Sequence, residues 1–216
     1  MRPGIRTQQS FMAEEARSQF ITKTYLHLFG AVMMFMVLEY FLLSNETARG
    51  IAMKAMQGSW LVVLGIFMVG SWGATFMARS QSQPVQYAGL ALYTCLEAAI
   101  FLPLLMYAFH ATGDGSLIFK ASMITLSGFI ALTGIAFVTR KNFSFLRSFI
   151  MWGGILAMIL IVGGSLMGFS LGLWFSGAMV GLAGAAILYT TSNIIHEYRE
   201  DQYVGASLEL FASLML

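Results

Sequence analysis

The sequence has few charged residues and a single cysteine, and each shortage excludes a class of protein. Charged residues make up 10% of the 216 residues, whereas soluble domains carry about 25%. The lone Cys95 excludes an intrachain disulfide and any metal cluster held by several cysteines. The net charge of +2 is too small to indicate binding to nucleic acid. The chain is therefore neither a typical soluble domain nor a disulfide-stabilised one.

Catalytic motifs are also missing. The sequence contains no G-x-S-x-G nucleophile elbow, no H-E-x-x-H pair, no phosphate-binding loop and no pair of acids at catalytic spacing in one loop. Its histidines, His27, His110 and His196, fall at three separate helix ends or loops, without the helical spacing of a metal-binding pair. We expect a non-enzymatic protein that has no cofactor and no metal site.

Long apolar blocks fill most of the chain. Hydrophobic residues account for 58% of the sequence, and the mean hydropathy is +0.75. A helix needs about 20 apolar residues to cross a bilayer, and the 22 glycines suit close packing of helices in lipid. The pattern predicts an all-α, polytopic membrane bundle of six to seven transmembrane helices. The six complete spans are expected at residues 24–43, 59–77, 87–109, 121–138, 149–166 and 171–192.

The two ends of the chain differ from these spans. A last apolar stretch begins near Val204 and contains too few residues to cross unaided. It is a re-entrant segment, a partial helix or, as we favour, a seventh span truncated at Leu216. Residues 1–23 are polar and lack the pattern of a cleaved signal peptide, so they are expected to form a tail, with a short interfacial helix at residues 17–24. Residues 24–216 are expected to form the bundle.

The placement of lysine and arginine predicts the orientation. Most of these residues fall in the N-terminal tail and in the alternate loops on the same side, including Arg79, Arg140 and Arg199. The opposite side carries Arg49, Lys54 and Lys120. The N-terminus is therefore expected in the cytoplasm.

Glu97 is the strongest candidate for a functional residue, because ionisable side chains at membrane depth are costly. It lies midway along the third predicted span, ahead of Pro103. Glu97 is either a group in a cation or proton pathway or a neutral acid that hydrogen-bonds between helices, and the sequence favours neither. Pro103 interrupts the hydrogen bonds of its helix, which makes it either a gating hinge or an ordinary kink.

Other polar and small residues are weaker candidates. Glu39 lies near the end of the first span and is expected to reach the membrane interface. Glu209 falls within the terminal apolar stretch. The sixth span has small residues on one face, which predict a helix-packing seam: Gly177, Gly181 and Gly184.

Three segments resemble the Bax inhibitor-1 family of multispanning membrane proteins. Residues 94–98 read TCLEA and are followed by LPLL at 102–105, similar to that family's T-x-x-E-G…G-P-L-L helix. Residues 131–133 read ALT and precede VTRKNFSFL at 138–146, similar to the loop after the family's fourth span. Residues 188–196 read LYTTSNIIH and continue to YVGASL at 203–208. Three motifs in the family's order carry the resemblance over most of the chain beyond Lys23.

The chain departs from the family at two positions. Many members carry two aspartates that share a proton and close a cation pathway, and the resemblance places Thr190 and Ser213 at these positions. Neither side chain holds a charge, so a calcium leak controlled by paired aspartates is not expected. Glu209 lies one helical turn from Ser213 on the same face, and we hypothesise that it partly substitutes as a displaced carboxylate.

The TSNIIH run at residues 191–196 resembles the bacterial branch of the family that associates with the membrane-anchored protease FtsH. This resemblance implies a protein of the bacterial inner membrane that restrains the protease through a short cytoplasmic tail. The first hypothesis is therefore a regulatory or binding partner of a membrane protease or another membrane complex. The alternatives are a calcium or proton leak channel gated through Glu97, and a structural accessory subunit of a larger membrane complex.

Overall fold

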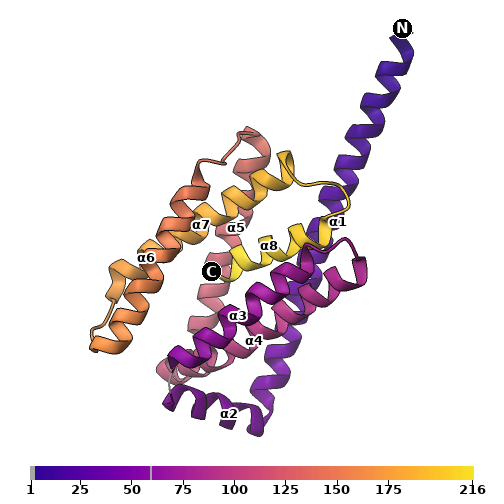
Figure 1. Cartoon of the computed structure of the whole chain (residues 1–216). Coiled ribbons are helices and arrows are strands. Elements are labelled where there is room, and N and C mark those ends of the chain that lie inside the picture. The colour runs from indigo at the N-terminus through magenta and orange to yellow at the C-terminus, as the bar shows by residue number, and fades with distance from the viewer. Residues whose placement is uncertain (1–2, 59) are drawn as a thin grey trace.

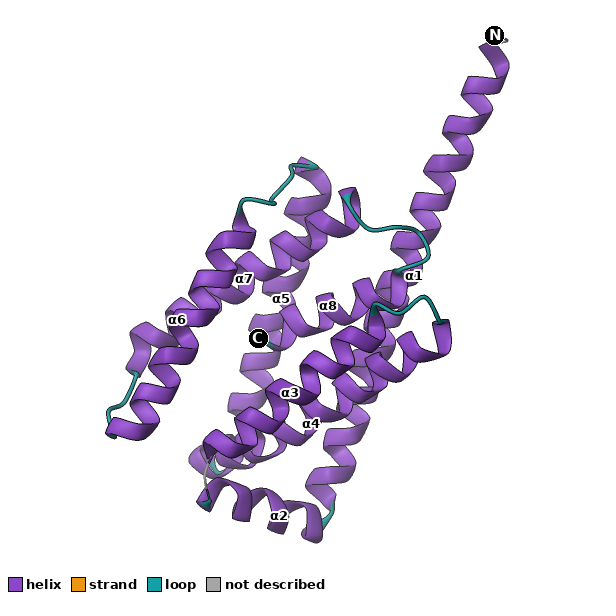
Figure 2. Ribbon diagram, in the orientation of Figure 1, coloured by secondary structure: helices purple, strands orange, loops and turns teal. Residues whose placement is uncertain are grey.

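The computed structural model describes residues 3–58 and 60–216, and the side chains of residues 14–55, 57–58, 60–111 and 113–216. Over these residues the chain forms eight helices and no strands (Figure 1, Figure 2). They are α1 (Pro3–Ser44), α2 (Glu46–Gln57), α3 (Trp60–Ala78), α4 (Gln83–Thr112), α5 (Ser116–Thr139), α6 (Leu146–Met167), α7 (Gly172–His196) and α8 (Tyr203–Met215). The predicted all-α bundle is confirmed.

Six of these helices are long and apolar enough to cross a membrane, namely α1 from Glu14, α3, α4 up to Ala111, α5, α6 and α7. Each contains the core of one predicted span. Ser59, the predicted start of the second span, lies outside the described residues.

The first helix is longer than the sequence pattern predicted. α1 runs without a break through the 42 residues Pro3–Ser44. Residues 17–24 therefore continue into the first span and do not form a separate interfacial helix. The N-terminal part of α1 extends beyond the rest of the bundle (Figure 1).

α2 was not expected, because its 12 residues are too few and too polar for a span. Its ends nevertheless carry ordinary helix signals. The Asn45 side chain accepts a hydrogen bond from the Ala48 amide at 3.1 Å, and Glu46 and Lys54 match the helix dipole at the first and last turns. α2 lies across one end of the bundle, between α1 and α3 (Figure 1).

α8 lies in the centre of the molecule. It packs against α1, α3, α4 and α7, with α5, α6 and α7 on one side and α1 to α4 on the other (Figure 1). Its largest buried side chains, Leu208, Leu210 and Phe211, have at most 1% exposure. Phe211 contacts the rings of Phe35 in α1 and Tyr93 in α4 at 6.2 Å between centroids in each pair. The segment from Val204 is therefore a core element of the bundle; its continuation into a longer span stays a prediction.

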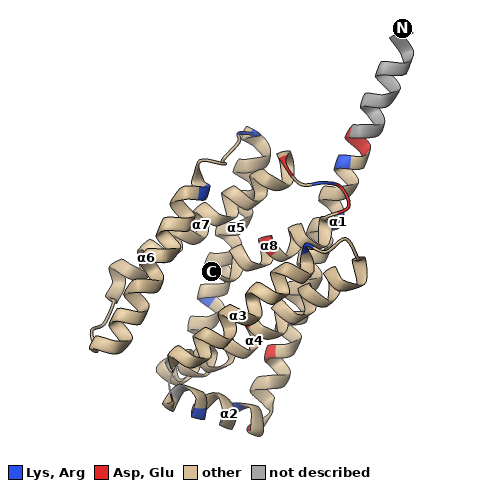
Figure 3. Ribbon diagram, in the orientation of Figure 1, with Lys and Arg blue, Asp and Glu red and all other residues tan. Residues whose placement is uncertain are grey.

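The outer surface is apolar, as lipid contact requires. Trp174 is 92% exposed and Phe76 is 82% exposed, on α7 and α3 respectively. Most described charged residues lie near helix ends or in connections (Figure 3). This arrangement is the reverse of a soluble protein, and it leaves the few charged groups within the bundle as exceptions that need an explanation.

Candidate functional site on the central helix

A seam of small residues brings α3, α4 and α8 into close contact. Ala74 and Ala78 of α3 are 0% and 3% exposed. A Cβ atom added to Gly89 of α4 would lie 2.6 Å from the Ala74 carbonyl oxygen, and one added to Gly205 of α8 would lie 2.8 Å from that of Ala78. Only glycine permits these backbone approaches. The seam fixes the end of α3 against the first turn of α8.

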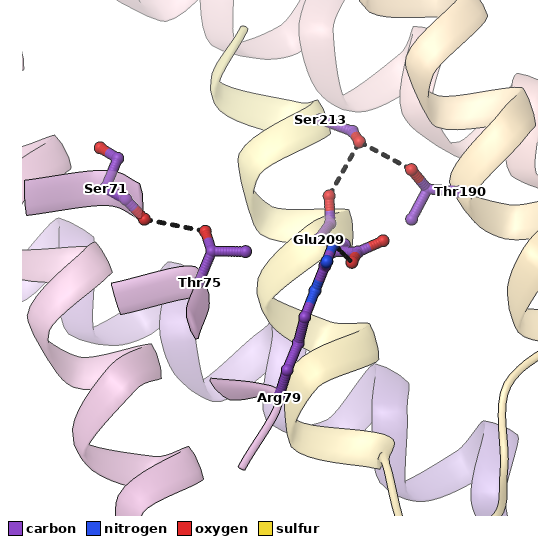
Figure 4. Close-up of polar contacts among 6 residues, drawn as sticks. All are labelled: Ser71, Thr75, Arg79, Thr190, Glu209 and Ser213. Atoms are coloured by element: carbon purple, nitrogen blue, oxygen red, sulfur yellow. Dashed lines mark hydrogen bonds and ion pairs between the residues drawn. The ribbon is translucent and has the colours of Figure 1, made fainter. Parts of the chain in front are cut away.

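This close approach positions an ion pair. Arg79 follows Ala78 directly, and Glu209 lies one helical turn after Gly205. Arg79 Nη2 donates to Glu209 Oε1 at 2.9 Å (Figure 4). The arginine side chain is 68% exposed and the glutamate side chain 24%, so the pair joins a partly buried carboxylate on α8 to an exposed guanidinium at the end of α3.

Tyr198 completes the surroundings of the carboxylate. Its side chain hydrogen-bonds to Glu209, and burial raises the pKa of its phenol. The hydrogen bond and the charge of Glu209 raise the pKa of Arg79 further above its usual value. Glu209 is thus held by a guanidinium and a phenol; its partial substitution for the paired aspartates stays a hypothesis.

Thr190 and Ser213 meet beside this ion pair. Their hydroxyl oxygens are 3.0 Å apart, between α7 and α8, and Ser213 also donates to the Glu209 carbonyl oxygen at 2.8 Å (Figure 4). Both residues are buried, at 5% and 7% exposure. The two positions that the resemblance assigned to paired aspartates are therefore in contact, and in this chain they form a neutral hydrogen bond.

Glu97 and Pro103 lie elsewhere, on α4. Glu97 is 5% exposed, and its carboxyl group hydrogen-bonds to the Tyr93 hydroxyl one turn earlier. No hydrogen bond or ion pair between described side chains joins Glu97 to Glu209. α4 continues as one helix through the buried Pro103. A pathway or gating role for these two residues stays a prediction.

The expected position of Glu39 was wrong. Glu39 does not reach the interface: it is 5% exposed, and both of its carboxyl oxygens are buried without a hydrogen-bond partner among the described residues. α2 packs against α1 and α4 and covers the end of the first span, together with a small apolar cluster that includes Ala52, Leu102 and Met106.

The predicted seam on α7 is also only partly present. Gly184 lies against α5, where an added Cβ would be 3.3 Å from Leu132 Cδ1. At Gly177 and Gly181, an added Cβ would have no described atom within 4 Å. The close backbone approaches at Gly89 and Gly205 were not singled out, because no local pattern shows which distant residues these glycines face.

Arg17 forms a further contact that sequence reasoning missed. From α1 its guanidinium donates to the carbonyl oxygens of Ile194 and Tyr198, at the C-terminal end of α7, where helix carbonyls lack intrahelical partners. It also lies 4.9 Å from the ring centroid of Phe20. This ring stacks on Tyr198 at 6.5 Å. Arg17 therefore fastens α1 to the connection between α7 and α8, next to the Glu209 site.

Among the described residues, no group of three or more histidine, cysteine, aspartate or glutamate side chains is placed to hold a metal ion. What the site offers chemically is one neutralised carboxylate, two hydroxyls and a phenol. These groups suit polar contacts between helices.

Comparison with known proteins places the chain in a family. The profile of the family described as "Inhibitor of apoptosis-promoting Bax1" matches residues 17–216. The modulator of FtsH protease YccA of Escherichia coli K12 is 29% identical over 181 residues, 81% of each chain. Its counterpart in Escherichia coli O6:H1 is named an inner membrane protein. Bax inhibitor 1 of Schizosaccharomyces pombe is 29% identical over 157 residues, 70% of this chain and 56% of that one. No solved structure gave a significant match. The protein is thus a multispanning helical membrane protein and belongs to the Bax inhibitor-1 family.

Proposed function

We propose that the protein is a non-enzymatic regulator of an FtsH-type membrane protease, or of another membrane complex, in the bacterial inner membrane. The observation that carries this proposal is the geometry of α1. The helix extends beyond the bundle on its N-terminal side (Figure 1), and Arg17 fastens it to the end of α7 where it leaves. Residues 3–16 therefore form a helical arm that continues from this contact.

Two further observations support this proposal. The relative YccA is named a modulator of FtsH protease and is similar over most of its length. Arg79, Arg140 and Arg199 belong to the connections α3–α4, α5–α6 and α7–α8, which lie at the same end of the bundle as the arm (Figure 1). This placement favours a cytoplasmic location for that end. In this orientation the arm lies on the cytoplasmic side.

Deletion of residues 2–13 tests the proposal, because it shortens the arm and keeps Arg17 and Phe20 in place. The tagged chain and the deletion variant are purified from native membranes in mild detergent, and the co-purifying proteins are identified. We expect a membrane protease with the intact chain and its loss from the deletion variant. A scrambled arm of the same length is the matched control for bulk. Recovery of equal amounts of protease with the intact chain and with the deletion variant would contradict a role for the arm.

A cation leak is the second candidate, favoured by the burial of Glu97 in the middle of α4. In this case Glu97→Gln would reduce calcium or proton flux into vesicles that contain the purified protein. Glu209→Gln serves as a comparison, because Glu209 is already held by Arg79. Loss of flux in the first variant together with an unchanged protease interaction would favour the leak.

A further inference from the structure

Three hydroxyl groups from three helices meet inside the bundle without hydrogen-bond partners. They belong to Tyr25 in α1, Thr133 in α5 and Thr191 in α7, and each oxygen is buried and unpaired among the described residues. Thr191 is 0% exposed. The Tyr25 hydroxyl faces both threonine side chains closely enough to interact with them, although no hydrogen bond of normal geometry joins the three.

Thr191 in this cluster differs from the other fully buried threonines that the structure describes. Buried polar groups in proteins are nearly always hydrogen-bonded, and the chain achieves this for its other fully buried threonines. Thr24 donates to the Phe20 carbonyl oxygen and Thr94 to that of Leu90, at 2.9 Å in each case. Thr191 has the same helical surroundings, yet its hydroxyl points to the cluster. Three unpaired hydroxyls in one place indicate a shared ligand.

The chemistry of the cluster limits what this ligand is. Hydroxyl groups both donate and accept hydrogen bonds and carry no charge, so they fit a small neutral molecule that also does both. Water meets this requirement, and a polar site with three partners is what a buried water needs.

We propose that Tyr25, Thr133 and Thr191 together bind one ordered water molecule. This water joins α1 to α5 and α7, the two helices that face it from the other side of the bundle. The contact between the rings of Tyr25 and Phe137, 5.9 Å apart, supports the same junction. The cluster also assigns a role to Thr133 and Thr191, two motif residues that the Glu209 site does not use.

A double-mutant cycle tests this site by thermal unfolding of the full chain in detergent or nanodiscs. Thr191→Val and Tyr25→Phe each remove one ligand of the water, and we expect each to lower the melting temperature by about 2–4 °C. The double variant should melt close to the single ones, because the water is already lost. Thr94→Val is the matched control, since its hydroxyl bonds within its own helix; its effect should add to that of Tyr25→Phe.

Two results would overturn the proposal. One is a Thr191→Val variant that melts at or above the temperature of the unmodified chain, or whose effect simply adds to that of Tyr25→Phe, because a hydroxyl without a ligand is costly to bury. The other is an experimental density map that resolves ordered water and shows none between the three oxygens. If Thr191→Val does not fold, Thr133→Val replaces it in the same cycle with the same expectations.

Discussion

At the scale of single residues, the ion pair between Arg79 and Glu209 joins the end of α3 to the middle of α8. The exposure of the arginine limits the contribution of the ion pair to stability, and we expect a coupling energy of about 0.2–1 kcal/mol between the two residues. A double-mutant cycle with Arg79→Gln and Glu209→Gln, read by thermal unfolding, measures this value. The pair Arg199–Asp201 is the matched control: it is 3.1 Å long and exposed on both sides, and it should show no coupling. A coupling at Arg79 no larger than the control value would contradict the structural role of the pair.

At Glu39, in contrast, removal of the charged group is expected to stabilise the protein. Its carboxyl group is buried without a hydrogen-bond partner among the described side chains and backbone groups, and such burial costs about 1–3 kcal/mol. Glu39→Leu keeps the approximate volume and removes the polar group, so it should raise the free energy of unfolding by about that amount. Chemical denaturation in detergent measures the change. A less stable variant would show that Glu39 has a partner that this single chain does not supply.

Part of this residue-level description could be predicted from the sequence. The burial of Glu97 followed from its position within an apolar span, and the meeting of Thr190 with Ser213 from the family motifs. The partner of Glu209 could not be predicted, because Arg79 is distant in the sequence and is brought near only by the packing of α3 on α8. Glu39 was misplaced because its burial results from helix packing, which a position near the end of an apolar span does not indicate.

At the scale of helices, the closest backbone approach of α4 to α3 depends on glycine at position 89. A methyl group at Gly89 would lie 2.7 Å from the Ala78 amide nitrogen, so Gly89→Ala should destabilise the protein by about 1–3 kcal/mol. Gly73→Ala is the matched control, because nothing lies within 4 Å of the added Cβ and alanine is the better helix former. Thermal unfolding of both variants tests this prediction. Equal melting temperatures for Gly89→Ala and Gly73→Ala would mean that α3 and α4 move apart to accept the methyl group without loss of stability.

The contact of α1 with the end of α7 is the second element that can be tested. Arg17→Met removes the donors to the Ile194 and Tyr198 carbonyl oxygens and keeps an apolar stem beside Phe20. We expect faster amide hydrogen exchange at residues 197–202 and at the start of α1. Arg147→Met changes an exposed arginine of α6 and should leave these segments unchanged. Unaltered exchange in Arg17→Met would show that other contacts hold α1 in place.

The long apolar blocks of the sequence predicted the six long helices, because a membrane span is defined by its length and hydrophobicity alone. They did not predict α2 or the central place of α8. α2 is too short and too polar for that signal, although Asn45, Glu46 and Gly58 could have indicated its ends. The position of α8 results from contacts with four other helices, which no local pattern encodes.

At the scale of the whole molecule, the charges within the bundle are few and several of them are paired or hydrogen-bonded. Glu209 is held by Arg79, Glu97 by Tyr93, and Arg17 by helix carbonyls. The structure thus offers polar contacts that fix helices to one another and an arm that leaves the bundle at a fixed point. These features suit a protein that acts by binding.

The most direct test is the effect of the chain on proteolysis. An FtsH-type protease from the same membrane is reconstituted in proteoliposomes with a membrane-protein substrate, and the rate of degradation is followed with increasing amounts of the chain. We expect the rate to fall with the intact chain and to stay near its starting value with the variant that lacks residues 2–13. An unchanged rate at saturating amounts of the intact chain would contradict the proposed regulatory role.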